Sequence, residues 1–148
     1  MNPSVSLMNQ FVNVEGQTGP SPAGNWLKPT LKHVEEGIIE AEITVLKEHT
    51  NPIRTMHGGV IALVIDEFTG ACAYTLHNKE LHVSQNLYVD YFKPAFEGET
   101  IRVISKCIRK GSKIINVECS LYNKENTLLA KGVGNLVNTG RPNPFFTS

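Results

Sequence analysis

The chain has 148 residues, 41% of them apolar, and its 14 Lys and Arg balance its 14 Asp and Glu. This length predicts one domain, argues against a second full one, and suffices to bury a core without disulfide or metal staples. The balanced charge argues against nucleic acid or an anionic membrane as partner and is compatible with self-association. The N-terminus has neither a basic segment nor a continuous apolar run, so a cytoplasmic protein is expected.

Residues 4–13 have the apolar spacing of a short amphipathic helix. The Gly- and Pro-rich residues 15–26 predict an ordered loop over a pocket. Two strands are expected at 31–34 and 37–47, because β-branched residues alternate there with charged ones. The segment 35–37, Glu-Glu-Gly, would form the turn of a hairpin between them.

Residues 60–76 are apolar nearly all the way round, which predicts a long helix buried on most sides. Asp66, Glu67, Thr69 and Gly70 interrupt the run, so it is too short and too charged to span a membrane. Period-two patterns then predict a four-stranded meander near 82–92, 99–109, 113–122 and 127–137. The predicted class is α+β, with an antiparallel sheet wrapped around one central helix. Such a sheet leaves an edge strand open, so a dimer is expected.

Several motifs argue against other chemistries. Cys72, Cys107 and Cys119 have no CxxC or metal-type spacing, so reduced thiols packed as small apolar groups are expected. The five His residues lack a metal-ligand spacing, no GxSxG is present, and we expect no metal. Gly132-Val-Gly134 lies in a strand pattern without a third glycine, which disfavours dinucleotide binding.

Gly58 and Gly59 come just before the predicted helix, where backbone N–H groups have no partner within the helix. The helix dipole adds positive charge there, and the missing side chains would let an oxyanion approach. Two glycines also suit a sharp turn with no binding role, and taken alone they favour that interpretation.

Asp66 and Glu67 lie within the apolar helix. A buried, unpaired carboxylate is unfavourable, so its pKa should rise or it should face a polar cleft. Adjacent helical residues point about 100° apart, so one of the two acids is expected to be functional and the other structural or exposed. A carboxylate beside an oxyanion site would serve as general base or nucleophile.

Residues 51–67, NPIRTMHGGVIALVIDE, carry His-Gly-Gly and then an Asp nine positions after the His. This segment resembles the hotdog-fold thioesterases, most closely the phenylacetate-pathway (PaaI-like) and THEM2-like acyl-CoA thioesterase family. VSQNLYVDYFKPA, residues 83–95, and IRKGSKI, residues 108–114, resemble the strand after that family's central helix and its basic hairpin. The resemblance implies a single hotdog domain with a core at about 31–137, an N-terminal segment at 1–30 and a tail at 138–148.

By this resemblance, Asp66 would be the general base or nucleophile that brings water to a thioester carbonyl. The Gly58 N–H would polarise that carbonyl, with Asn51 as a second donor or as a group that holds the geometry. His57 would position substrate or organise the loop, and Ser84 would orient the attacking water. Because some hotdog thioesterases use Glu as the acid, Glu67 stays an alternative to Asp66.

The resemblance also implies a site at a dimer interface, with Asp66 and Ser84 opposite Asn51 and Gly58 of the partner. A homodimer or a homotetramer is expected, with acyl-CoA as substrate and no separate cofactor. Basic residues flanking a tight turn are often only solvated charge, but here they would contact coenzyme A. The expected substrate-binding residues are Gly59, Glu67, Tyr91, Lys93, Pro94, Arg109, Lys110, Gly111, Ser112 and Lys113.

Two other functions compete with the acyl-CoA thioesterase. A hotdog hydratase or dehydratase is disfavoured, because the Phe-Pro-Gly often found near the His in such enzymes is absent. A non-catalytic acyl-CoA-sensing module usually accompanies another domain, and the retained acid Asp66 would be a needless loss of stability in a pure scaffold. Phe145 and Phe146 would either pack on a partner chain or be disordered.

Overall fold

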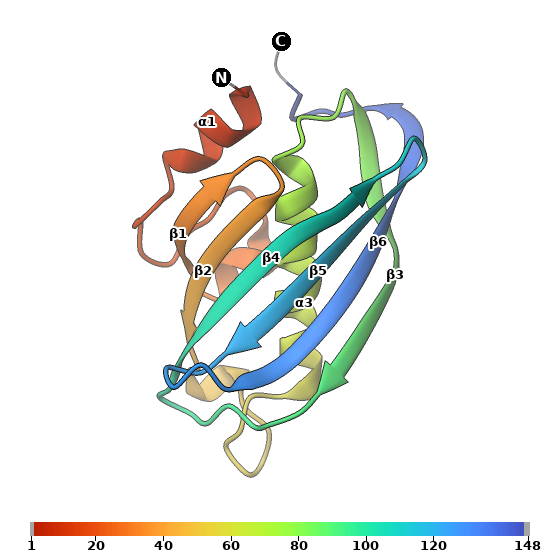
Figure 1. Ribbon diagram of the computed structural model, residues 1–148. Coiled ribbons are helices and arrows are strands. Elements are labelled where there is room, and N and C mark those ends of the chain that lie inside the picture. The colour runs from red at the N-terminus through yellow and green to blue at the C-terminus, as the bar shows by residue number, and fades with distance from the viewer. Residues whose placement is uncertain (1, 147–148) are drawn as a thin grey trace.

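The computed structural model describes residues 2–146 and consists of one curved antiparallel sheet around one long helix (Figure 1). The helices are α1 (Pro3–Asn9), α2 (Pro22–Trp26), the 3-10 helix η1 (Lys47–His49) and α3 (Gly58–Tyr74). The strands are β1 (Thr30–Glu35), β2 (Ile38–Thr44), β3 (Glu80–Tyr91), β4 (Thr100–Lys110), β5 (Ile114–Tyr122) and β6 (Leu128–Pro142). The predicted α+β class and the wrapped central helix are confirmed, as is the β1–β2 hairpin.

The strand order is β1-β2-β4-β5-β6-β3, so the predicted four-stranded meander is wrong for its first strand. Only β4, β5 and β6 form a meander, while β3 pairs with β6 at the far edge. The residues after β3 do not turn back tightly, because they pair with other segments. The Met56 N–H donates to Ala95 O at 2.7 Å, and Val45 N–H donates to Glu99 O at 2.8 Å. This connection carries the chain from one edge of the sheet to β4, beside β2.

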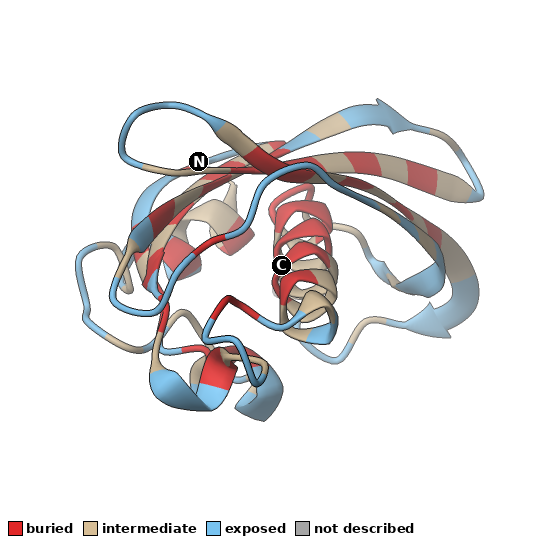
Figure 2. Ribbon diagram, turned by 90° about the horizontal axis from the view of Figure 1, so that it is seen from below, coloured by how far each residue is buried: buried red, intermediate tan, exposed pale blue. Residues whose placement is uncertain are grey.

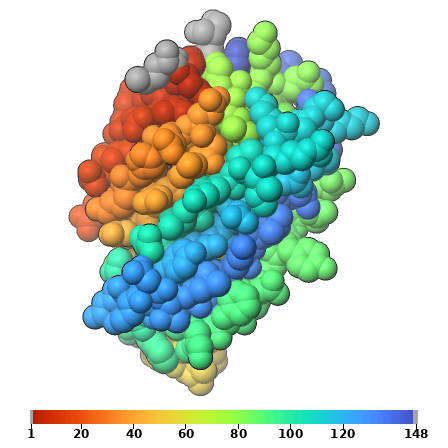
Figure 3. Space-filling view, in the orientation of Figure 1, coloured from red at the N-terminus to blue at the C-terminus, as the bar shows by residue number. Residues whose placement is uncertain are grey.

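Helix α3 packs against the inner face of the sheet, and the strands close over it (Figure 3). Two glycines of β6 permit this close approach. A Cβ on Gly132 would lie 2.6 Å from Ile65 Cγ2, and one on Gly134 would lie 2.9 Å from Thr69 Oγ1. The Gly-Val-Gly motif is therefore the crossing point of helix and sheet.

The helix is buried along one face only, and this corrects the expectation of burial on most sides (Figure 2). The buried residues are Ile61, Val64, Ile65, Phe68, Thr69, Cys72 and Ala73. The opposite face is half-buried and carries Asp66, Glu67 and Gly70. Within residues 2–146 no helix is long and apolar enough to cross a membrane.

The three cysteines are unpaired and lie on the inner side of the sheet or on α3. Cys72 and Cys119 are buried, as expected for small apolar groups, and Cys107 is half-buried. Burial raises the pKa of the Cys72 thiol to about 12 and raises the pKa of Cys119 as well. All three thiols are therefore protonated at neutral pH.

Both terminal segments are ordered against the end of α3. The N-terminal helix is shorter than predicted and is capped by the side chain of Asn2. Residues 15–26 contain the short helix α2, which the loop prediction did not include. In the tail, the Phe146 ring stacks on His77 with ring centroids 4.3 Å apart, so it contacts its own chain.

Candidate active site

The first turn of α3 presents a backbone donor. His57 is the N-cap, and its Nδ1 accepts from the Gly59 N–H at 2.9 Å. Gly58 and Gly59 are thus the first two helical residues rather than a preceding loop. Within residues 2–146 the Gly58 N–H has no acceptor. A free N–H at the positive end of a helix dipole can bind a developing oxyanion.

The loop before α3 is held by Asn51. The Asn51 Oδ1 accepts from the N–H groups of Ile53 and Thr55, both at 3.1 Å, and its Nδ2 donates to Thr55 Oγ1 at 2.8 Å. Asn51 therefore fixes the turn that leads into the helix. This arrangement fits a residue that holds the geometry of the site, because the acceptor and one N–H of the side chain are used within the loop.

Asp66 and Ser84 form a contact between α3 and β3. The Ser84 Oγ donates to Asp66 Oδ1 at 2.8 Å. Asp66 is half-buried and Ser84 is exposed, so the pair faces accessible space. A carboxylate beside a hydroxyl can accept a proton from a water that the hydroxyl orients.

Glu67 points to the other side of the helix. Its Oε2 accepts from Ser21 Oγ, the N-cap of α2, at 3.1 Å. A Cβ on Gly24 would lie 2.3 Å from Glu67 Oε1, so a side chain at this position would require the carboxyl group to move. Burial raises the pKa of Glu67, the Ser21 bond lowers it, and the charge of Asp66 raises it further. The two carboxyl groups therefore have different hydrogen-bond partners, Ser84 for Asp66 and Ser21 for Glu67.

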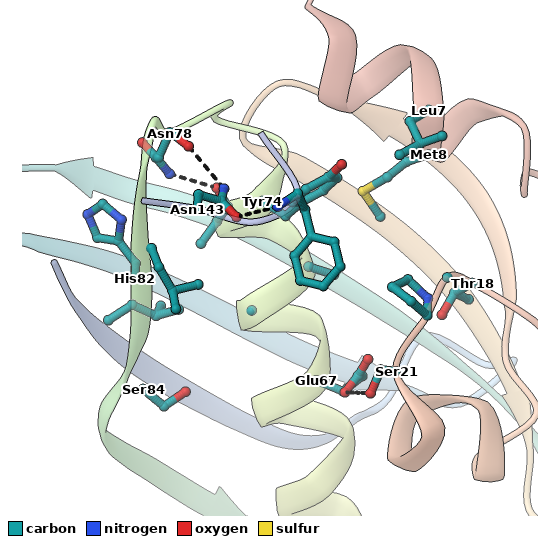
Figure 4. Close-up of a pocket in the computed structure, with 18 of the residues that line it drawn as sticks. Leu7, Met8, Thr18, Ser21, Glu67, Tyr74, Asn78, His82, Ser84 and Asn143 are labelled. Atoms are coloured by element: carbon teal, nitrogen blue, oxygen red, sulfur yellow. Dashed lines mark hydrogen bonds between the residues drawn. The ribbon is translucent and has the colours of Figure 1, made fainter. Parts of the chain in front are cut away.

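An apolar cavity of about 390 Å³ lies along the half-buried face of α3 (Figure 4). Asp66, Glu67 and Ser84 line one part of it, and the loop Thr18–Ser21 forms a side wall, as expected for an ordered loop over a pocket. An open groove of about 370 Å³ continues between α3 and β3 past Gly59. Asp66 and Ser84 line both spaces, so they stand where cavity and groove meet.

The donor at Gly58 and the Asp66 carboxylate do not converge within one chain. They are eight residues apart on α3, which at 1.5 Å per residue is about 12 Å along the axis. A nucleophile and an oxyanion donor must both lie about 3 Å from one reacting group. Gly58 and Asp66 of one chain therefore cannot both reach one carbonyl group, and we refer to them as two half-sites.

Tyr91 lies beside the start of α3, and its hydroxyl donates to Gly58 O at 2.8 Å. Lys93 and Pro94 follow in the exposed connection to β4. The predicted residues 109–113 lie at the β4–β5 turn, at the opposite end of β4 (Figure 1), while Gly59 and Glu67 lie in α3. One chain therefore does not bring these two groups together.

The β4–β5 turn has three exposed basic residues at or beside it. Arg109 and Lys113 are exposed, with Gly111 and Ser112 between them. The Lys110 Nζ instead donates to Leu76 O at 3.4 Å, at the C-terminal end of α3. A cation at this position stabilises the helix dipole, so Lys110 has a structural contact that the sequence did not indicate.

The cavity also contains residues that the sequence analysis did not assign to the site. Leu7, Met8 and Phe11 from the N-terminal segment line it, together with Tyr74 of α3 and Phe145 of the tail. No local motif marks them, because they meet only through tertiary packing. Ser21 was detectable in principle, since Ser before Pro is a typical helix N-cap.

Comparison with known proteins gives a consistent result. The family model described as "Thioesterase superfamily" matches residues 54–130. Human acyl-coenzyme A thioesterase 13 is 30% identical over 71% of this chain and 76% of its own length.

Solved structures share the fold. Mouse thioesterase superfamily member 2 has a TM-score of 0.69 and 28% identity, and the match covers 73% of this chain and 80% of that one. A hypothetical thioesterase of Streptococcus pneumoniae with coenzyme A has a TM-score of 0.72 at 16% identity, and the match covers 78% of this chain and 88% of that one. The chain has the hotdog fold of these thioesterases and belongs to the thioesterase superfamily.

Proposed function

We propose that this protein is an acyl-CoA thioesterase that hydrolyses its substrate to a free acid and coenzyme A. The observation that carries the proposal is the Ser84–Asp66 hydrogen bond at the junction of an apolar cavity with an open groove. The cavity suits an acyl group, and the groove gives room for the pantetheine arm. The human relative, acyl-coenzyme A thioesterase 13, supports the same substrate class.

The reaction follows from the chemistry of the two half-sites. Ser84 orients a water molecule. The oxygen of this water attacks the thioester carbon while Asp66 accepts one of the water's protons. In the alternative mechanism, Asp66 itself attacks the carbon as nucleophile. The Gly58 N–H stabilises the negative charge on the carbonyl oxygen. The carbon–sulfur bond then breaks, and the departing thiolate takes the proton that Asp66 accepted from the water, which restores the carboxylate. These steps use no metal or cofactor.

We place the complete site between two copies of the chain. About 12 Å separates Gly58 from Asp66 along one helix, so a second α3 must supply the missing half. The edge strand β3 carries Ser84 and has one side unpaired within residues 2–146, and its Tyr88 is 75% exposed. Pairing through this edge would give a homodimer with two sites, which can pair again into a homotetramer.

Coenzyme A would bind through the exposed positive charges. Arg109 and Lys113 are candidates for its phosphates, and Tyr91, Lys93 and Pro94 for the path near the helix start. Because the two groups lie at opposite ends of β4, we infer that one coenzyme A molecule meets them on different chains. Arg109→Ala should then raise KM for coenzyme A esters more than for short thioesters that lack the nucleotide.

The test is free-thiol release from short, medium, long and aryl acyl-CoA esters, with Asp66→Asn as the inactive variant. Asn conserves the volume and can still accept from Ser84, so the fold should persist while turnover falls by about 10²–10⁴. Glu67→Gln is the matched control one residue along the helix. Wild-type turnover by Asp66→Asn would transfer the role to Glu67. No release from any ester by folded, oligomeric protein would favour the binding-only alternative.

A further inference from the structure

The apolar cavity has a defined length along α3. The helix lines it from Asp66, at the reactive end, to Tyr74, and Glu67, Gly70 and Ala71 of the same helix line it between them. Asp66 and Tyr74 are eight residues apart, so this face of the cavity extends about 12 Å. Nothing lies within 4 Å of a Cβ added at Gly70, which shows that the middle of the cavity is open.

Length and volume give the same capacity. An extended alkyl chain advances about 1.25 Å per carbon for a carbon–carbon bond near 1.5 Å, so about 12 Å accommodates roughly ten carbons. The volume of about 390 Å³ holds roughly a dozen groups of the size of water, at about 30 Å³ each. Both figures describe an acyl group of medium length.

The far end of the cavity is formed by the two terminal segments. Leu7 and Met8 of α1 and Phe145 of the tail line the cavity, and both segments bond to the residues just after α3. All three lie outside residues 54–130, which match the thioesterase family model. The matched residues therefore give no information about this wall, and its role is argued from the structure alone.

Both segments are fastened to the residues that follow α3. On the N-terminal side, the Asn2 Nδ2 donates to Thr75 O at 2.6 Å, and Ser4 Oγ is 2.8 Å from His77 Nδ1. On the tail side, the Asn143 Nδ2 donates to Asn78 O at 3.0 Å. The stack of Phe146 on His77 joins the two attachments. These bonds hold α1 and the tail in place across the end of the cavity.

We propose that the cavity takes a medium-chain acyl group of about eight to twelve carbons, and that α1 and the C-terminal tail set its upper length limit. This inference rests on the proposed thioesterase function. Leu7 and Phe145 determine specificity by excluding longer chains, and they take no part in the chemistry.

The experiment compares kcat/KM for decanoyl-CoA and hexadecanoyl-CoA in wild type and in the variant L7A/F145A. Removing both side chains should open the far wall and raise the hexadecanoyl-to-decanoyl ratio roughly 10-fold. The matched control is V14A/I108A. Val14 and Ile108 are 40% and 57% exposed, against 44% and 53% for Leu7 and Phe145, and they do not line the cavity. The control should leave the ratio unchanged.

Calorimetric binding of the free acids separates the two proposals. Wild type should bind decanoate and reject hexadecanoate, and L7A/F145A should bind both. If wild type and L7A/F145A show the same preference for acyl-chain length, in both turnover and binding, the inference is wrong and the thioesterase function is unaffected. A different result would be that wild type binds only the shorter acid, L7A/F145A binds both, and neither protein hydrolyses any acyl-CoA. This would support the inference about the wall and overturn the proposed thioesterase activity.

Discussion

Replacing Gly58 by Pro tests the oxyanion donor with little disturbance of the fold. The substitution removes the one N–H that the proposed mechanism needs. Gly58 is the first residue of α3 and is not among the glycines with positive φ, so proline suits it. The preceding His57 has φ −60° and ψ 136°, the extended conformation that proline requires of its neighbour. A Cβ at this position meets the Tyr91 ring at 3.5 Å, an ordinary contact.

The expected loss follows from the single hydrogen bond removed. An oxyanion donor contributes about 10²–10³ in kcat, or about 2.7–4 kcal/mol of transition-state stabilisation. Gly58→Pro should lose that factor in thioester hydrolysis and keep its unfolding midpoint. Gly58→Ala adds a similar side-chain carbon but keeps the N–H, so it should retain turnover. Full activity in a correctly folded Gly58→Pro protein would refute the role of this N–H.

Mixing variants tests whether the site is shared between chains. Gly58→Pro and Asp66→Asn should each be inactive alone. In a mixed dimer of the two, one site carries both defects and the other is intact. Random pairing of equal amounts should therefore restore about a quarter of the wild-type sites. If co-expressed chains form mixed dimers and recover no activity, the half-sites of one chain act together and the shared site is wrong.

Other side chains give predictions about stability. Burial raises the pKa of Glu67, so the protonated carboxyl group stabilises the folded state, and this stabilisation is lost as the pH rises through the folded-state pKa. Gln resembles the protonated form at every pH. Urea unfolding should therefore show Glu67→Gln to be more stable than wild type at about pH 8 but not at about pH 4. Gly70→Ala should raise stability by about 0.5–1 kcal/mol in thermal unfolding, because it lies inside α3 with free space around it, and a loss would show a hidden contact there. His49 is fully buried and its ring nitrogens pair with Leu46 N–H and Trp26 O, so His49→Ala should lose about 2–4 kcal/mol in urea unfolding; an unchanged midpoint would contradict this.

Local patterns in the sequence predicted the elements well but not their neighbours. The long helix and the β1–β2 hairpin follow from periodicity and turn residues. The position of β3 does not, because it depends on a long connection that pairs Ala95 and Glu99 with distant segments. Packing of the termini onto residues 75–79 is equally non-local, so the far wall of the cavity was not predictable.

The candidate site was predictable only where its residues lie close together in the sequence. The spacing from His57 to Asp66 is local and identified the loop and the helix, and a resemblance added Ser84 from β3. The sequence could not decide between Asp66 and Glu67, since both lie in the same apolar run. Adjacent helical residues point about 100° apart. This difference in direction separates Asp66 from Glu67 only when β3 and α2 pack on either side of α3.

That separation also decides which acid is the better base. A raised pKa would suit Glu67 to proton transfer, but a base must first lie within hydrogen-bond reach of its water. The Glu67 carboxyl accepts a hydrogen bond from Ser21 and lies close to Gly24, on the side of α3 away from β3. Asp66 faces Ser84 and lines both the cavity and the groove. We therefore expect Asp66 rather than Glu67 to be the base, and burial accounts for the raised pKa of Glu67.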